Sequence, residues 1–109
     1  MVSEEILAEI TRRLVKGFHP DKIILFGSQA RGTADEHSDV DILVICPVEG
    51  NRLELMLDMD RTLKGMYLAR DIAVLTSDEY KRDSKIPGTI ARYAYKEGKI
   101  LYARSKTRH

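Results

Sequence analysis

The sequence predicts an α/β (α+β) fold, in which a small mixed β-sheet of about three to four strands is flanked by about four to five helices. Short apolar runs with the length of strands recur along the chain, for example Ile23 to Phe26 and Ile42 to Ile45. Between them lie longer segments with apolar residues at helical spacing, several of which follow a helix-capping residue. The chain has 109 residues, so we expect one domain that spans positions 1–109 and buries one core.

The first helix is predicted to follow Ser3, which can cap it, and to end near Gly17. Its apolar stripe consists of Ile6, Leu7, Ile10 and Leu14. The connector after the helix contains His19, which we expect to be exposed rather than catalytic. A first strand then runs from Lys22 to Phe26, and its nearly continuous apolar character is typical of a strand that is covered on both faces.

A Gly-Ser pair, Gly27-Ser28, follows this strand directly. Glycine permits a sharp turn because it has no β-carbon, and Ser28 suits the N-cap of a short helix that Gly32 would end. The N-terminus of a helix presents backbone N–H groups and the positive end of a dipole, both of which favour a phosphate group. The turn therefore predicts a site for phosphate contacts.

Two aspartates, Asp39 and Asp41, open the second strand, which is predicted to run from Asp39 to Cys46. Residues two apart on a strand share a face, so the two carboxylates would lie on one side with their α-carbons roughly 7 Å apart. Like charges at that separation repel and raise each other's pKa. Such a pair is tolerated either in full contact with water or with a cation between the carboxylates, and Mg2+ suits two carboxylates beside substrate phosphates.

Asp71 stands at the start of a third predicted strand, which covers residues 70–75. A neighbouring strand could therefore bring a third carboxylate to Asp39 and Asp41. The alternative is an aspartate that pairs with Arg70 or lies exposed at the end of a strand.

The remaining segments complete the predicted helices and strands. A helix capped by Asn51 is expected over residues 52–64, with a buried side formed by Leu53, Met56, Leu57 and Leu63. Thr76 and Glu79 have the spacing of a capping box and predict a short helix through Arg82. A last helix is expected from Pro87 to Glu97, followed by a strand over residues 99–102 and a flexible basic tail over residues 103–109.

Composition argues against several classes of protein. The formal net charge is +1, so bulk charge gives no reason to expect nucleic acid or a membrane surface as a direct partner. The single cysteine, Cys46, ends an apolar run and is expected to be buried, which fits a reducing cytosol and a cytoplasmic protein. No stretch approaches the ~20 apolar residues of a membrane span, and the N-terminal segment lacks the layout of a signal peptide.

Gly27-Ser28, ten further residues and then Asp39-Val40-Asp41 form a pattern that resembles the signature of the nucleotidyltransferases of the DNA polymerase beta superfamily. The pattern is most similar to that of the minimal nucleotidyltransferases, the small MntA-like antitoxins that pair with HEPN-domain toxins. The Ala30-Arg31-Gly32 continuation also looks like that family. The resemblance implies a nucleotidyltransferase fold, ATP as the substrate, and two Mg2+ ions held by the catalytic residues Asp39, Asp41 and Asp71.

The resemblance also implies roles for the residues around the carboxylates. Gly27 and Ser28 would hold the β- and γ-phosphates, and Arg31 either steadies phosphate charge or is simply an exposed helix arginine. His37, in the loop before the second strand, is either a solvated loop residue or a nucleotide contact.

A short chain of this kind leaves no room for a second substrate domain, so we expect another polypeptide to complete the pocket. The resemblance implies a protein adenylyltransferase that transfers AMP to a tyrosine of a HEPN ribonuclease toxin and so silences the toxin. It would act in a hetero-oligomer with the toxin, or as a homo-oligomer. Two alternatives stay open: an antitoxin that neutralises its toxin by binding alone, and an enzyme that nucleotidylates a small molecule or an RNA end.

Overall fold

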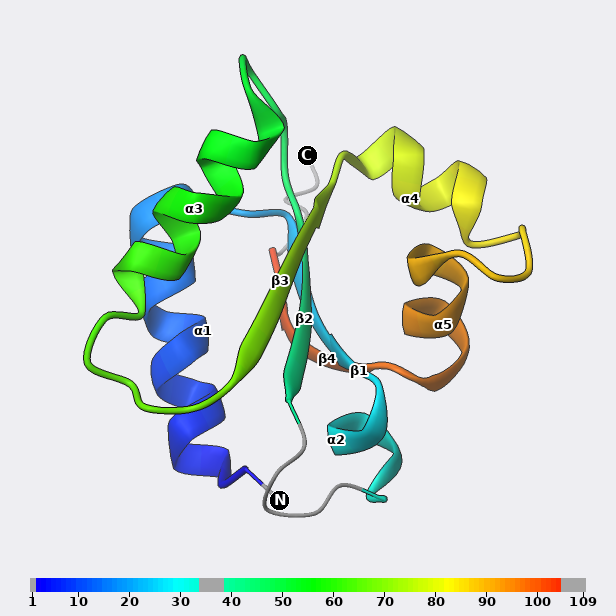
Figure 1. Ribbon diagram of the computed structural model, residues 1–109. Helices are drawn as coiled ribbons and strands as arrows, with labels where there is room; N and C mark the ends of the chain where they lie inside the picture. Colours follow the sequence, from blue (N-terminus) through cyan, green and yellow to red (C-terminus); the bar gives the residue numbers. More distant parts are fainter. Residues whose placement is uncertain (1, 34–38, 105–109) are drawn as a thin grey trace.

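The computed structural model describes residues 2–33 and 39–104, and these form five helices and four strands (Figure 1). The elements in chain order are α1 (Glu4–Phe18), β1 (Lys22–Phe26), α2 (Ser28–Arg31), β2 (Val40–Ile45), α3 (Arg52–Thr62), β3 (Arg70–Leu75), α4 (Ser77–Asp83), α5 (Ile90–Glu97) and β4 (Lys99–Ala103).

The strands form one mixed sheet in the order β3-β2-β1-β4. β1 is antiparallel to both of its neighbours, whereas β2 and β3 run parallel. The parallel pair is joined by α3, as a crossover between parallel strands requires. This sheet and its helices confirm the predicted mixed α/β class.

Helices cover both faces of the sheet, with α1 and α3 on one side and α4 and α5 on the other (Figure 1). Because successive strand residues point to opposite faces, β1 supplies Ile23 and Leu25 to the larger cluster beneath α1 and α3. Ile24 goes to the smaller cluster beneath α5, with Leu43 and Ala94. Strand β1 is therefore buried on both faces, as its apolar sequence predicts.

Capping side chains start the helices much as predicted. The side chains of Ser3, Asn51 and Thr76 each accept a hydrogen bond from a backbone N–H in the first turn of the helix that follows. Thr76 and Glu79 form the full capping box. The last helix differs, because the hydroxyl of Thr89 caps it and α5 begins at Ile90, beyond Pro87.

The buried side of helix α3 agrees with the predicted one at Met56 and at Leu63, just after the helix, but not at Leu53 and Leu57. Leu53 and Leu57 keep 62% and 46% of their surface exposed, whereas Met59 and Leu63 are fully buried. Leu55 and Met56 pack partly against the same cluster as Met59. Apolar residues occur around much of this helix, so spacing alone could not select the side that packs against α1 and β3.

The ends of several elements also differ from the predicted ones. Helix α1 continues through Gly17 to Phe18 and ends at His19, which has a φ of 48°. Strand β2 lacks the first and last residues predicted for it, so Asp39 lies just before it. Strand β4 includes Ala103, and the N–H of Arg104 donates to the carbonyl of Asp21 at 2.8 Å, so the chain stays attached to the sheet beyond residue 102.

Two further expectations concern single features. Cys46 is a buried free thiol in the larger cluster, as predicted. No helix within the described residues has the length and apolar character needed to span a membrane.

Candidate active site

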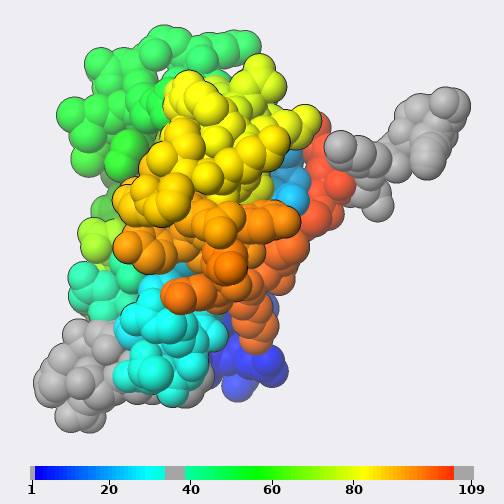
Figure 2. All heavy atoms as spheres, turned by 90° about the vertical axis from the view of Figure 1, so that its right-hand side faces the viewer, coloured from blue at the N-terminus to red at the C-terminus, as the bar shows by residue number. Residues whose placement is uncertain are grey.

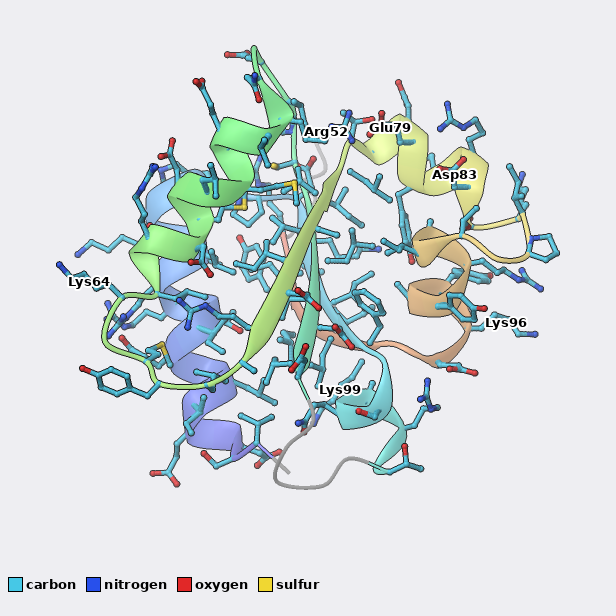
Figure 3. All side chains as sticks on the ribbon, viewed as in Figure 1. Arg52, Lys64, Glu79, Asp83, Lys96 and Lys99 are labelled. Carbon is cyan, nitrogen blue, oxygen red and sulfur yellow. The ribbon has the colours of Figure 1, made fainter. Side chains whose placement is uncertain are left out.

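Asp41 and Asp71 are direct neighbours across the parallel pair β2 and β3. In-register residues of adjacent strands point to the same face of a sheet. That face is the one beneath α5, because Leu43 and Ala73, two residues further along each strand, join the smaller cluster. In Figure 3, oxygen-bearing side chains gather over the lower halves of β2 and β3, above α2. The predicted convergence of two carboxylates from separate strands is therefore present.

Electrostatics support this proximity. Burial raises the pKa of the Asp41 carboxyl above its usual value, and the negative charges of Asp71 and then Asp39 raise it further. The positive charge of Arg31 acts in the opposite direction. Asp39 is exposed and precedes β2, but its charge reaches Asp41. The charges of Asp71 and Asp39 thus both act on Asp41.

The Gly-Ser turn makes direct contact with this cluster. Phe26 is the register partner of Asp41, so Gly27 follows at the same end of the sheet. A β-carbon at Gly27 would lie 2.4 Å from Oδ2 of Asp41, and Gly27 has a φ of 76°. Only a glycine fits here, because a side chain would displace the carboxylate and the backbone conformation disfavours other residues.

Helix α2 begins one residue earlier than predicted. Gly27 is its N-cap, and Ser28 is its first helical residue, because the carbonyl of Gly27 accepts hydrogen bonds from the N–H groups of Ala30 and Arg31, both at 3.1 Å. Gly32 ends the helix in a left-handed conformation, as predicted. The hydroxyl of Ser28 therefore comes from the first turn of α2, next to the glycine that touches Asp41.

Side chains on both sides of α2 hold it in place. Gln29 is buried, and its Oε1 accepts a hydrogen bond from the N–H of Val2 at 3.0 Å. Arg31 forms an ion pair with Glu97 at the end of α5, with 3.2 Å between Nη1 and Oε1. Sequence reasoning missed Glu97. The available signal was an acidic residue in the last turn of a helix, where cations are normally favoured.

Three further expectations concern the pairing of Asp71 and the roles of His19 and His37. Asp71 does not pair with Arg70, whose Nε instead donates to Asp60 at 2.8 Å. His19 lies before β1, at the opposite end of that strand from Gly27, and takes no part in the cluster. His37 lies outside the described residues.

The carboxylates fit a hard cation such as Mg2+. Within residues 2–33 and 39–104, no three His, Cys, Asp or Glu side chains form a ready-made metal-binding group. Mg2+, however, needs only one or two carboxylates and takes its other ligands from water and substrate phosphates. Asp41 and Asp71 supply two aligned carboxylates, and a cation between them would relieve the repulsion that raises the pKa of Asp41.

Known proteins are similar to this chain in sequence and in fold. A family model described as nucleotidyltransferase domain matches residues 4–105. The putative protein adenylyltransferase MJ0604 of Methanocaldococcus jannaschii is 37% identical over 81 residues, which cover 74% of this chain and 77% of that protein.

Solved structures also have a fold similar to that of this chain. A putative nucleotidyltransferase from Sulfolobus solfataricus superimposes with a TM-score of 0.65 at 25% identity, covering 92% of this chain and 79% of the other. The fold also matches a chain in the complex of a tri-AMPylated Shewanella oneidensis HEPN toxin with its MNT antitoxin. There the TM-score is 0.56 at 20% identity, and the match covers 93% of this chain and 72% of the other, a likeness of fold alone.

Proposed function

Because this chain belongs to the nucleotidyltransferase domain family, we propose that it transfers AMP from ATP to a tyrosine hydroxyl of a cognate HEPN-domain toxin. The coarser part of this assignment, an enzyme related to the putative protein adenylyltransferases, follows from the family itself. The observation that supports the chemistry, nucleotidyl transfer with a bound cation, is the in-register placement of Asp41 and Asp71 beside Gly27. A carboxylate pair next to the turn that begins α2 suits a nucleotide bound with a cation.

In this proposal Asp39, Asp41 and Asp71 hold Mg2+ and are the catalytic carboxylates. When bound, the metal neutralises phosphate charge and lowers the pKa of an attacking hydroxyl. Asp71 comes from the exposed end of β3, where an acceptor hydroxyl can approach. It would take the proton as the hydroxyl oxygen bonds to the α-phosphorus and pyrophosphate leaves.

The turn between β1 and α2 would hold the β- and γ-phosphates of the nucleoside triphosphate. The contact between Gly27 and Asp41 brings this backbone against the carboxylates, so phosphates held there would lie beside the metal ligands. The Ser28 hydroxyl can donate to a phosphate oxygen. Arg31 adds positive charge on the same side, as its effect on the pKa of Asp41 indicates.

The choice of acceptor rests on the relatives. Chains of this family include putative protein adenylyltransferases, and the matched Shewanella complex contains a HEPN toxin that is itself AMPylated. We propose the same arrangement for this chain: a single minimal nucleotidyltransferase domain that acts in the cytoplasm, in complex with its toxin, and needs the toxin to complete the pocket.

Mass spectrometry of the partner tests this function. Incubation with Mg-ATP and the HEPN protein encoded beside this chain should add about 329 Da per AMP residue to a tyrosine of the partner. Asp41→Asn should abolish the addition, and EDTA should do the same. Asp58→Asn, on the exposed side of α3 and ion-paired with Arg61, is the matched control and should retain activity. An unchanged partner mass with folded protein would overturn the proposal.

The same experiment separates the two alternatives. An antitoxin that acts by binding alone would still neutralise its toxin when Asp39 and Asp41 are both changed to Asn. An enzyme that modifies a small molecule or an RNA end would label that acceptor and leave the HEPN protein unmodified.

A further inference from the structure

Arg31 lies between the carboxylate cluster and the end of α5. Its Nη1 is 3.2 Å from Oε1 of Glu97, and it is the last residue of α2, the short helix whose N-cap Gly27 lies against Asp41. The two side chains of the ion pair are 46% and 43% exposed, so a ligand can reach the guanidinium. Figure 2 shows that α2 and the end of α5 lie side by side on this surface.

Glu97 is an unusual residue for its position. It is the last residue of α5, where the negative end of the helix dipole disfavours a carboxylate. Its pairing with Arg31 compensates for that placement. Glu97 is therefore stabilised by its contact with α2 rather than by the dipole of α5.

The next residue fixes where Glu97 lies. A β-carbon at Gly98 would be 2.2 Å from the carbonyl oxygen of Ala94 and 2.5 Å from Cγ2 of Ile24. The end of α5 is thus seated directly on β1, the strand that leads into Gly27. Strand β1 leads into α2 and also supports the end of α5. The distance from Glu97 to α2 is therefore set by packed backbone rather than by flexible loops.

We propose that Glu97 is a positioning residue that holds the Arg31 guanidinium toward the triphosphate of the bound nucleotide. This inference rests on the proposed function. The ion pair uses one terminal nitrogen of Arg31, which leaves Nε and Nη2 to donate to phosphate oxygens. Holding a long side chain in one orientation before the ligand arrives removes part of the entropy lost on binding.

Simple charge repulsion predicts the opposite effect. A carboxylate close to a triphosphate repels it, so removing the charge of Glu97 should tighten nucleotide binding if Glu97 had no positioning role. The proposal instead predicts weaker binding. The sign of the change therefore discriminates between the two explanations.

Calorimetric titration with Mg-AMP-PNP, an ATP analogue with an imido group between the β- and γ-phosphates, measures this sign when no HEPN protein is present to accept AMP. Glu97→Gln should weaken binding by about three- to fivefold, with the unfolding temperature within about 2 °C of the original, since an exposed ion pair contributes little to folding. In the Arg31→Ala background, Glu97→Gln should cause no further weakening. Glu4→Gln removes a carboxylate paired with Lys99 and is the matched control, with unchanged affinity.

A second measurement needs no nucleotide. The heteronuclear NOE of the Arg31 Nε–H group should report an ordered side chain in the original protein and a mobile one in Glu97→Gln. Equal mobility in both proteins would overturn the inference, as would equal or tighter Mg-AMP-PNP binding by Glu97→Gln. Either result would leave the proposed function intact if the original protein binds the analogue. An original protein that does not bind it would overturn both.

Discussion

Gly27 lies so close to the carboxylate of Asp41 that a β-carbon on Gly27 would be 2.4 Å from Oδ2. Gly27 lies in the turn between β1 and α2 and Asp41 lies on β2, so their contact joins the proposed phosphate-binding turn to the proposed metal-binding carboxylates. The contact is with the carboxylate at the end of the Asp41 side chain, which an added β-carbon would displace. Any change at Gly27 must therefore act on Asp41.

Gly27→Ala should abolish AMP transfer and destabilise the protein. The φ of 76° alone costs an alanine about 1 kcal/mol, and the overlap with Asp41 displaces the carboxylate. Gly50→Ala is the matched control, because Gly50 has a φ of 81° but nothing within 4 Å of an added β-carbon. Urea unfolding should show a loss of stability in both variants, whereas the transfer assay should fail only for Gly27→Ala.

Asp71→Asn should lower the rate of AMP transfer by about 100-fold or more, because the proposed proton acceptor and metal ligand is lost. The fold should not suffer, since Asp71 is exposed and its charge repels Asp41. Unfolding in urea without Mg2+ should show equal or slightly higher stability than the original. A marked loss of stability would instead identify Asp71 as a structural residue.

The stability contributed by Asp41 should depend on pH in a defined direction. Its pKa in the folded protein is raised above the ordinary 3.8, chiefly by burial and then by Asp71 and Asp39. The folded state therefore holds the proton more tightly than the unfolded state, so stability is fully present below pH 3.8 and falls as the pH rises through the folded pKa. Asp41→Asn should remove this decline. In urea unfolding without Mg2+, the free energy of unfolding of Asp41→Asn should exceed that of the original protein by an amount that grows with pH.

Glu79→Gln should destabilise the protein by about 1–2 kcal/mol, with allowance for partial exposure. Its two carboxylate oxygens each accept a hydrogen bond from Arg52 at 2.8 Å, which ties α4 to the start of α3 (Figure 3). This pairing lowers the pKa of Glu79 from 4.5 to about 2, so its stabilisation is present above pH 4.5 and is lost as the pH falls toward 2.

Glu9→Gln is the comparison for Glu79→Gln. The pKa of Glu9 is also lowered to about 2, first by Arg12 and then by Arg13, but both partners lie on the same helix and the pairs are local. Thermal unfolding should show a smaller loss for Glu9→Gln, because its ion pairs connect no separate elements.

Met59→Ala should cost about 2–4 kcal/mol, because Met59 is fully buried in the larger cluster and its removal leaves a cavity. Leu57→Ala, two residues earlier on the same helix, should cost less than about 1 kcal/mol because 46% of Leu57 is exposed. Urea unfolding of the two variants tests which side of α3 packs. Equal losses would contradict the observed orientation.

The sequence alone determined much of the local structure and the family of this protein. Strands β1 and β3 have the predicted bounds, Ser3, Asn51 and Thr76 cap their helices as predicted, and the Gly-Ser and Asp-x-Asp patterns identified the family. These features depend on residues close together in the chain, whose backbone preferences and side-chain periods act over a few positions.

Only the tertiary structure decided how distant segments meet. The register that aligns Asp41 with Asp71, the contact of Gly27 with Asp41, the pairing of Arg31 with Glu97 and the buried side of α3 all join elements far apart in sequence. Each is set by which surfaces pack together when one core forms. Local patterns of side chains along the sequence do not reveal that choice. A local and a tertiary constraint both act at Gly27. Its φ requires glycine locally, and the approach of Asp41 requires glycine as well.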